Sequence, residues 1–191
     1  MVNKIEPNIL IAAKNGSLQA FENILATYEQ AIFGYIYRLV GQKEDAEDIT
    51  QEVFIKLYKN ISKLDLELKF SSWLYKIATN TAYDWLRKKQ RRHEFLFLDD
   101  ENRKTKLLDT IADPQAISAI ETIEKQPAFD QITNALKNLK VEYRSVLLLF
   151  YYQEFSYQEI SDALSLPINT VKTYLHRGKT LLKNKLTNLE V

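Results

Sequence analysis

Hydrophobic side chains recur every three or four residues along most of this chain, the spacing that places them on one face of an α-helix. The polar residues between them fall on the opposite face. The pattern predicts helices over residues 7–14, 18–40, 43–61, 70–92, 128–139, 141–152, 157–164 and 167–186. Residues 62–69 alternate apolar and polar positions, but since no partner strand is visible we predict a structured loop there.

Residues 94–126 interrupt the periodicity and carry many charges. We interpret them as a flexible linker between two small helical domains, residues 1–93 and 127–191. The chain of 191 residues contains only four Gly and four Pro, which disfavours a turn-rich β fold. The prediction is therefore an all-α protein of two domains.

Pro167 lies in the middle of a strong helical pattern. Proline costs a helix interior about 3 kcal/mol, but it is tolerated in the first turn, where its missing N–H would have no partner. It therefore marks the start of a second helix. Because only Ser165 and Leu166 remain as the connection, the two helices must cross steeply, as in a helix-turn-helix. The apolar residues expected between them are Ile160, Ala163, Leu164, Val171 and Leu175.

The second helix of this pair is expected to expose a polar and positively charged face. Its members are Asn169, Thr170, Lys172, Thr173, His176, Arg177 and Lys179. Such side chains suit the base edges of the major groove and the phosphates of DNA. An ordinary helical hairpin with a solvated basic face is the alternative that the spacing alone leaves open.

Charge is segregated along the chain, although the net charge is only +1. Residues 44–52 hold five acidic side chains and no basic one, whereas residues 87–92 hold five basic side chains and no acidic one. The basic run exceeds what the end of a helix needs to balance its dipole, so it is a candidate phosphate-binding patch. The acidic run is either a solvated face or a docking surface for a basic partner.

The aromatic side chains that follow residue 69 allow two interpretations. Phe70, Tyr75 and Tyr83 can be core residues, which is the commonest role of large aromatic side chains. Alternatively, together with Asn80 and the preceding loop, they form a surface on which unpaired bases stack or are held.

The sequence indicates neither catalysis nor a cofactor. It contains no Cys, so disulfides and thiolate metal sites are excluded. Residues 178–180 (GKT) resemble the end of a phosphate-binding loop, but Thr173 stands where the first Gly is required. His93 and His176 do not have metal-ligand spacing. We therefore expect no enzyme, no cofactor, no metal and no small-molecule substrate.

No apolar run is long enough to span a bilayer. The N-terminal residues lack the apolar core and cleavage site of a signal peptide. The expectation is a cytoplasmic protein that is not itself a membrane protein.

Three segments, in this order, resemble the sigma factors of bacterial RNA polymerase. They are DAEDITQEVFIKLYKNI (45–61), FSSWLYKIATNTAYDWLRKKQRR (70–92) and LKNLKVEYRSVLLLFYYQEFSYQEISDALSLPINTVKTYLHRGKTLL (136–182). The resemblance is to the extracytoplasmic-function group, which keeps only domains two and four of the larger family. It implies a subunit that binds core RNA polymerase, directs it to promoter DNA and stabilises the opened strand. It also implies control by an anti-sigma factor.

The resemblance implies a role for each matching segment. The residues that would dock on the clamp coiled coil of the polymerase largest subunit are Asp45, Glu47, Asp48, Gln51, Glu52 and Phe54. The loop 64–70 would capture a flipped base of the minus-ten element. The residues expected to contact that element are Leu64, Asp65, Phe70, Tyr75, Asn80, Arg87, Lys88, Lys89, Arg91 and Arg92. Those that would read the minus-thirty-five element are Thr170, Lys172, Thr173, His176, Arg177 and Lys179.

Two other classes of function remain open at this point. A self-sufficient helix-turn-helix regulator would bind its operator as a dimer and would need a self-complementary face. A protein-interaction adaptor would carry the same basic faces merely as solvated surface, and substitutions there would not affect DNA binding.

Overall fold

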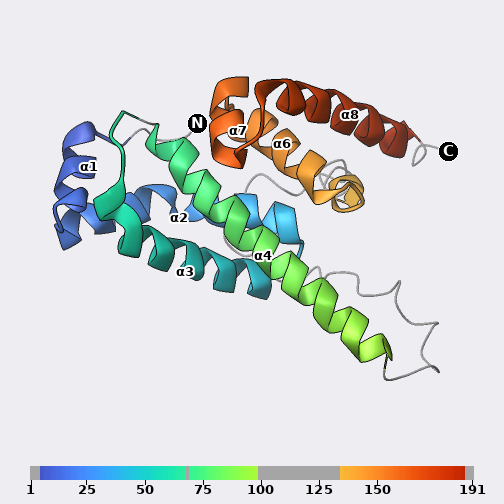
Figure 1. Ribbon diagram of the computed structural model, residues 1–191, viewed down its shortest axis with the longest axis horizontal. Helices are drawn as coiled ribbons and strands as arrows, with labels where there is room; N and C mark the ends of the chain where they lie inside the picture. The colour runs from blue at the N-terminus through green and yellow to red at the C-terminus, as the bar shows by residue number, and fades with distance from the viewer. Residues whose placement is uncertain (1–4, 68, 99–133, 188–191) are drawn as a thin grey trace.

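The computed structural model describes residues 5–67, 69–98 and 134–187, and in these ranges it contains helices and no strand. The helices are α1 (Pro7–Lys14), α2 (Leu18–Val40), α3 (Lys43–Asn60), the short 3-10 helix η1 (Ile61–Lys63), α4 (Phe70–Leu98), α6 (Val141–Tyr151), α7 (Tyr157–Leu164) and α8 (Ile168–Thr187) (Figure 1). The predicted all-α class is confirmed for these residues.

The ends of α2 follow directly from its sequence. The Ser17 hydroxyl accepts a hydrogen bond from the Ala20 N–H at 3.3 Å and so caps the first turn. At the other end Gly41 adopts a left-handed conformation with φ of 87°, and its N–H donates to the Tyr37 carbonyl at 2.8 Å. Glycine takes this conformation without steric cost, which explains why the helix ends there.

Helix α4 is longer than the sequence pattern predicted. It ends at Leu98 rather than near Arg92, so residues 94–98 of the predicted linker are helical. The reason is that residues 93–98 contain neither Gly nor Pro, and a run of basic side chains does not by itself end a helix. The rest of the predicted linker lies outside the described residues, as does the start of the predicted helix 128–139, of which 134–137 are helical.

The first helical unit is built around the apolar face of α2, which packs against α1, α3 and α4. Its fully buried side chains include Ile24, Ile32, Ile36, Leu39, Ile49, Val53, Leu57, Leu74, Ala78 and Ala82. A buried polar pair lies among them: the hydroxyls of Tyr35 and Thr79 share a hydrogen bond of 2.7 Å. This pairing satisfies two groups that would otherwise be costly to bury.

The second unit consists of α6, α7 and α8, in which α6 is central. Residues 146–149 of α6 are all buried, because α7, α8 and α2 pack around this helix. A continuous apolar run, rather than an alternating one, is what such a surrounded helix requires. Ile160 and Ala163 of α7 and Val171 of α8 complete the core of the unit.

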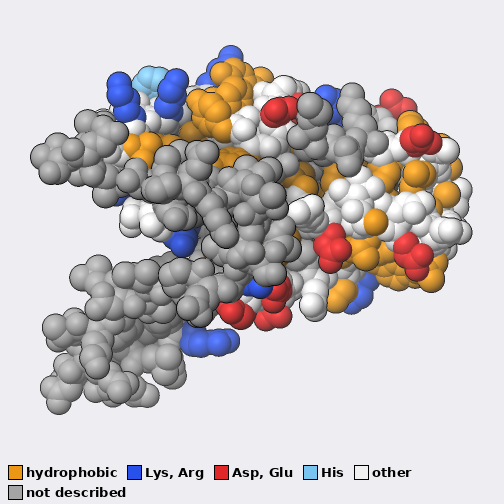
Figure 2. Space-filling model, turned by 180° about the vertical axis from the view of Figure 1, so that it is seen from behind, with side chains coloured by type: hydrophobic (Ala, Val, Ile, Leu, Met, Phe, Trp, Pro, Cys, Tyr) orange, Lys and Arg blue, Asp and Glu red, His pale blue; other side chains and the backbone are white. Residues whose placement is uncertain are grey.

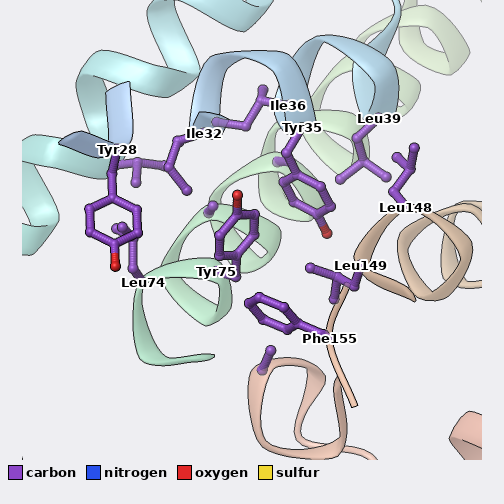
Figure 3. Close-up of a cluster of buried hydrophobic side chains, with 14 of the residues drawn as sticks. Tyr28, Ile32, Tyr35, Ile36, Leu39, Leu74, Tyr75, Leu148, Leu149 and Phe155 are labelled. Atoms are coloured by element: carbon purple, nitrogen blue, oxygen red, sulfur yellow. The ribbon is translucent and has the colours of Figure 1, made fainter. Parts of the chain in front are cut away.

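The two units share one continuous core (Figure 3). The ring of Phe155, which precedes α7, lies edge-on to Tyr75 of α4, with 5.1 Å between ring centroids. Beside it the Tyr75 hydroxyl donates to Gln153 Oε1 at 2.6 Å. Further along α4 the hydroxyls of Tyr83 and Ser145 share a hydrogen bond of 2.6 Å, and burial raises the pKa of Tyr83 to about 12.

An ion pair at the edge of this contact yields a pH-dependent prediction. Glu159 closes a capping box with Ser156 at the start of α7, and its carboxylate also accepts from Lys69 Nζ at 2.9 Å. Burial raises the pKa of Glu159, but the hydrogen bonds from Ser156 and Lys69 outweigh it, so the pKa lies below the ordinary 4.5. The ionised form is thus favoured by folding, and its contribution is present above pH 4.5.

We expect Glu159→Gln to lower the free energy of unfolding at neutral pH by less than about 1 kcal/mol, because the ion pair is partly exposed. The deficit should shrink as the pH falls through the Glu159 pKa, since the wild-type carboxylate is then protonated too. Urea denaturation at neutral and acidic pH measures it, with Glu22→Gln, an exposed position on α2, as the control. A deficit that grows in acid would contradict this account.

Candidate nucleic-acid and polymerase interfaces

The turn between α7 and α8 interrupts the helical conformation at the position that the sequence predicted. Ser165 ends α7 in the left-handed region, with φ of 53° and ψ of 42°. The Leu166 N–H reaches back to the Ser161 carbonyl at 3.1 Å. The Pro167 carbonyl then accepts from the N–H of Thr170 at 2.8 Å, which starts α8. The helix-turn-helix is confirmed, with Pro167 immediately before the first residue of α8.

The outer face of α8 carries the donors that a DNA-reading helix needs. Lys172, Thr173, His176, Arg177 and Lys179 are exposed, and Thr170 is partly exposed. Lysine and arginine side chains flank a histidine at this edge of the molecule (Figure 2). A shallow groove beside them is lined by Asn169, Thr170, Thr173 and Tyr174. The structure therefore brings all six predicted residues to one accessible surface.

Gly178 sets how closely α8 approaches α6. A Cβ atom at this buried position would lie 3.1 Å from Leu147 Cδ1 and 3.4 Å from Tyr143 Cβ. The close approach keeps the inner side of α8 against the core and leaves the basic side facing outward. The GKT sequence at 178–180 thus reflects helix packing rather than a phosphate-binding loop.

The loop between η1 and α4 is anchored at its ends and exposed at its middle. Leu64 and Phe70 are buried, whereas Asp65, Leu66 and Glu67 are exposed. An Asp65 carboxylate oxygen accepts from the Glu67 N–H at 3.0 Å, which forms a tight local turn. Only part of the predicted base-capture loop is therefore presented to solvent.

A stripe of exposed polar side chains runs along α4 away from this loop. Its members are Lys76, Asn80, Asp84, Arg87 and Arg91, each three or four residues from the next and so on one side of the helix. Lys88 and Arg92 are exposed beside it. The acidic N-terminal half of α3 forms a separate surface, on which Glu47, Asp48, Gln51 and Glu52 are exposed.

Comparison with known proteins identifies the two units. Residues 24–92 match Sigma-70 region 2, and residues 129–182 match Sigma-70, region 4. The chain is 36% identical over 178 residues to the ECF RNA polymerase sigma factor SigW of Bacillus subtilis, which covers 92% of this chain and 94% of that protein. The chain belongs to the extracytoplasmic-function sigma factors.

A second relative agrees with this assignment, and two solved structures have a similar fold. The ECF RNA polymerase sigma-E factor of Haemophilus influenzae is 30% identical, with 92% of each chain covered. In fold, this sigma factor is similar to CnrH, which was solved with the cytosolic domain of CnrY. The TM-score is 0.69 and the sequence identity 18%, with 95% of this chain and 97% of CnrH covered. It is also similar to RpoE of Bartonella quintana, solved with the anti-sigma factor NepR (TM-score 0.67, 19% identity, 89% and 98% covered).

Family membership fixes the class of function. A sigma factor is a subunit that binds RNA polymerase and promoter DNA to start transcription at specific promoters, and it is not an enzyme. The operator-binding regulator and the adaptor are thereby set aside. Among the described residues, no helix is both long and apolar enough to cross a lipid bilayer.

Three buried aromatic or apolar side chains of the sigma factor contradict the expectation that they face DNA. Tyr75 is fully buried between Tyr35 and Phe155. Leu64 and Phe70 are also buried, with exposed fractions of 2% and 6%. The alternative interpretation of the aromatic residues as core is correct for Tyr75 and Phe70. Asn80, by contrast, is exposed as a strand-holding residue requires.

Lys89 is engaged within region 2 rather than presented to phosphates. Its ammonium group lies 2.9 Å from an Asp45 carboxylate oxygen, 2.8 Å from Gln42 Oε1 and 4.5 Å from the centre of the Trp85 ring. Asp45 is correspondingly covered, with 22% of its side chain exposed. The structure therefore uses this predicted DNA contact and this predicted polymerase contact to hold α4 against α3.

Phe54 contradicts the expectation that it belongs to the docking surface, because it is buried in the core of region 2 with only 6% exposed. Two apolar residues that the sequence analysis missed lie on the outside of α3 instead: Ile55 and Tyr58 are 53% and 57% exposed. Both fall outside the apolar stripe of α3, and that signal could have identified them.

Lys76, one turn before Asn80, was missed because it stands outside the basic run.

Proposed function

We propose that the outer face of α8 reads the minus-thirty-five element of the promoter. One observation carries this proposal. Helix α8, the second helix of the helix-turn-helix, presents Lys172, Arg177 and four further hydrogen-bonding side chains on one exposed face. Helices of this kind enter the major groove and contact base edges and phosphates.

The test is transcription with core RNA polymerase on fragmented genomic DNA, followed by sequencing of the start sites. The sigma factor should direct initiation at promoters that share an upstream element. Gel shifts with the sigma factor alone should show only weak promoter binding, because linked domains gain avidity only when both can engage their elements at once, and here regions 2 and 4 pack on one shared core. Start sites that share no upstream element would contradict the proposed role of α8.

We propose that the exposed part of the loop 64–70 and the polar stripe on α4 hold the opened minus-ten element. Lys76, Asn80, Arg87 and Arg91 follow one line along α4, on which Asp84 also lies and pairs with Arg87 at 3.3 Å, and such a line suits contacts to a single strand and its phosphates. Asp65 and Leu66 belong to the loop that precedes α4. Flipping a base out of the stack costs a few kcal/mol, which contacts in the loop would offset.

We propose that the acidic face of α3, defined as Glu47, Asp48, Gln51 and Glu52, binds the clamp coiled coil of the polymerase largest subunit. Exposed Ile55 and Tyr58 extend the face with apolar area. A rim of charges around an apolar patch is a common arrangement in protein interfaces.

Charge reversal tests this docking surface. Asp48→Lys is expected to weaken binding to core polymerase about tenfold or more, because like charges across an interface are strongly unfavourable. Titration of labelled sigma factor with core enzyme measures the affinity, and the effect should diminish as salt is raised. The matched control is Glu22→Lys, an exposed acidic position on α2. Equal losses in both variants would remove support for a specific site.

We further infer that the sigma factor acts in the cytoplasm and is held inactive there by an anti-sigma factor. RpoE of Bartonella quintana, a protein of similar fold, was solved with such a partner. A partner of this kind would cover the surfaces assigned above to DNA and polymerase. If that partner is deleted from the cells, transcription by this sigma factor in their extracts should rise, and such a rise would support this inference.

A further inference from the structure

Helix α1 lies outside the region 2 match, which begins at residue 24, yet it contacts the loop proposed to capture a base. Lys14, in the last turn of α1, donates a hydrogen bond from Nζ to the Leu64 carbonyl at 2.7 Å. The contact joins residues 50 positions apart and is partly buried. Hydrogen bonds from a charged donor are stronger than neutral ones, so Leu64 is firmly held.

The other end of the loop is held by α2. The Phe70 ring lies edge-on to Tyr28, with 5.4 Å between ring centroids, and Tyr28 is buried. Both residues that bound the exposed part of the loop are therefore supported from outside it, Leu64 by Lys14 of α1 and Phe70 by Tyr28 of α2.

Within the loop, the hydrogen bonds of the described residues are local: the Leu64 N–H donates to the Ile61 carbonyl at 3.0 Å, at the end of η1. Asp65, Leu66 and Glu67 are exposed, and the Glu67 N–H to Asp65 contact is a local turn. The direction in which Asp65 and Leu66 leave the core is therefore set by the Leu64 backbone. The hydrogen bond from Lys14 holds that backbone from α1, which is not part of the loop.

We propose that Lys14 is a positioning residue for capture of the minus-ten base: it holds the Leu64 carbonyl so that the exposed part of the loop keeps the shape a flipped base needs. This inference rests on the proposed minus-ten function of the loop. Lys14 itself contacts no DNA. It contributes by reducing the conformational freedom that the loop would otherwise lose on binding.

The experiment uses holoenzyme and single-stranded oligonucleotides carrying the non-template minus-ten sequence of a promoter it transcribes. One oligonucleotide is intact, and the others each carry one abasic site. Wild-type holoenzyme should lose about tenfold in affinity at the position of the captured base, the scale of one stacked and held base. Lys14→Met should bind the intact strand about tenfold more weakly and should lose the dependence on that position.

Three variants separate positioning from general damage. Lys14→Arg keeps a charged donor and should restore most of the positional dependence. Lys140→Met, at an exposed lysine preceding α6, is the control and should behave as wild type. If Lys14→Met fails to fold, Lys14→Gln, which keeps a shorter neutral donor, takes its place in the same comparison.

The outcomes distinguish base capture by the loop from the role of Lys14 in it. A wild-type profile with no sensitive position would contradict base capture by the loop, and with it the proposed minus-ten function. A wild-type profile with one sensitive position that Lys14→Met retains would overturn the role of Lys14 alone. Loss of polymerase affinity in Lys14→Met, in parallel with loss of strand affinity, would show a structural role and would also overturn it.

Discussion

Replacing Arg144 with methionine is expected to lower the free energy of unfolding by about 3 kcal/mol, the usual cost of leaving buried polar partners unsatisfied. Arg144 is only 8% exposed, and its guanidinium donates to three backbone carbonyls. They belong to Leu39 in the last turn of α2 and to Lys137 and Leu139 before α6. Methionine fills much of the same volume and offers no donor.

The three carbonyls explain why a charge is stable in this position. Burial lowers the pKa of Arg144, which expresses the cost of removing the cation from water. The last carbonyls of a helix lack partners within it and carry partial negative charge. The Leu39 carbonyl is one of these, so the guanidinium both completes its hydrogen bonding and balances the end of α2. Arg144 thereby links region 4 to region 2.

Equilibrium urea denaturation measures the effect. The control is Arg87→Met, since Arg87 is exposed and its ion pair is with Asp84, three residues away on the same helix. Its free energy of unfolding should change by less than about 0.5 kcal/mol. Equal changes for the two arginines would show that the carbonyls around Arg144 are satisfied by water when the side chain is removed.

The features that the sequence predicted well are those set by residues close together in the chain. The turn at Ser165–Leu166 follows from one proline and from the helical period on both sides of it. The end of α2 follows from Gly41. In each case a conformational preference of the local backbone decides the outcome, and no distant partner is needed.

The predictions that were wrong concern side chains whose environment depends on distant residues. Tyr75 is buried because Gln153 and Phe155 of region 4 cover it, and no pattern near Tyr75 indicates this. Lys89 was predicted to contact phosphates on the strength of its basic neighbours. It is held instead by Asp45, which is 44 residues away in the sequence. Charge composition identifies a basic segment but not which of its members is already paired.

The same distinction applies to the residues that were missed. The helical period of α3 already places Ile55 and Tyr58 outside its apolar stripe, but only their exposure in the folded chain shows that they are available to a partner. The role of Gly178 requires the position of Leu147 across the helix pair. A helical period shows which side of a helix is apolar, whereas function here depends on which exposed residues lie side by side.

Arg177→Ala is expected to reduce initiation at promoters that depend on the upstream element by about 10–100-fold, the range that one good base or phosphate contact supports. Arg177 is exposed on the outer face of α8, one turn after Thr173. It is therefore available to contact a base edge or a phosphate. Run-off transcription on matched and scrambled upstream elements measures the loss.

The variant Arg177→Lys separates the two ways in which this arginine can act. A guanidinium that reads guanine does so through two parallel hydrogen bonds, which an ammonium cannot reproduce. If Arg177 contacts a base, Arg177→Lys should lose activity nearly as Arg177→Ala does, and only on promoters with the matched base pair. If Arg177 contacts a phosphate, Arg177→Lys should retain most activity. Arg177→Ala should then reduce initiation at all promoters alike, and the slope of log binding affinity against log salt concentration should fall by about one.

The control for both variants is Lys140→Ala, which removes an exposed positive charge from region 4 at the residue before α6 rather than on α8. It should leave the preference for matched over scrambled elements unchanged, because long-range charge alone carries no sequence information. If Arg177→Ala also leaves that preference unchanged, α8 does not read the upstream element through this residue. Arg177 would then serve only to attract DNA, and recognition would have to come from Thr170, Lys172 and Thr173 nearer the start of the helix.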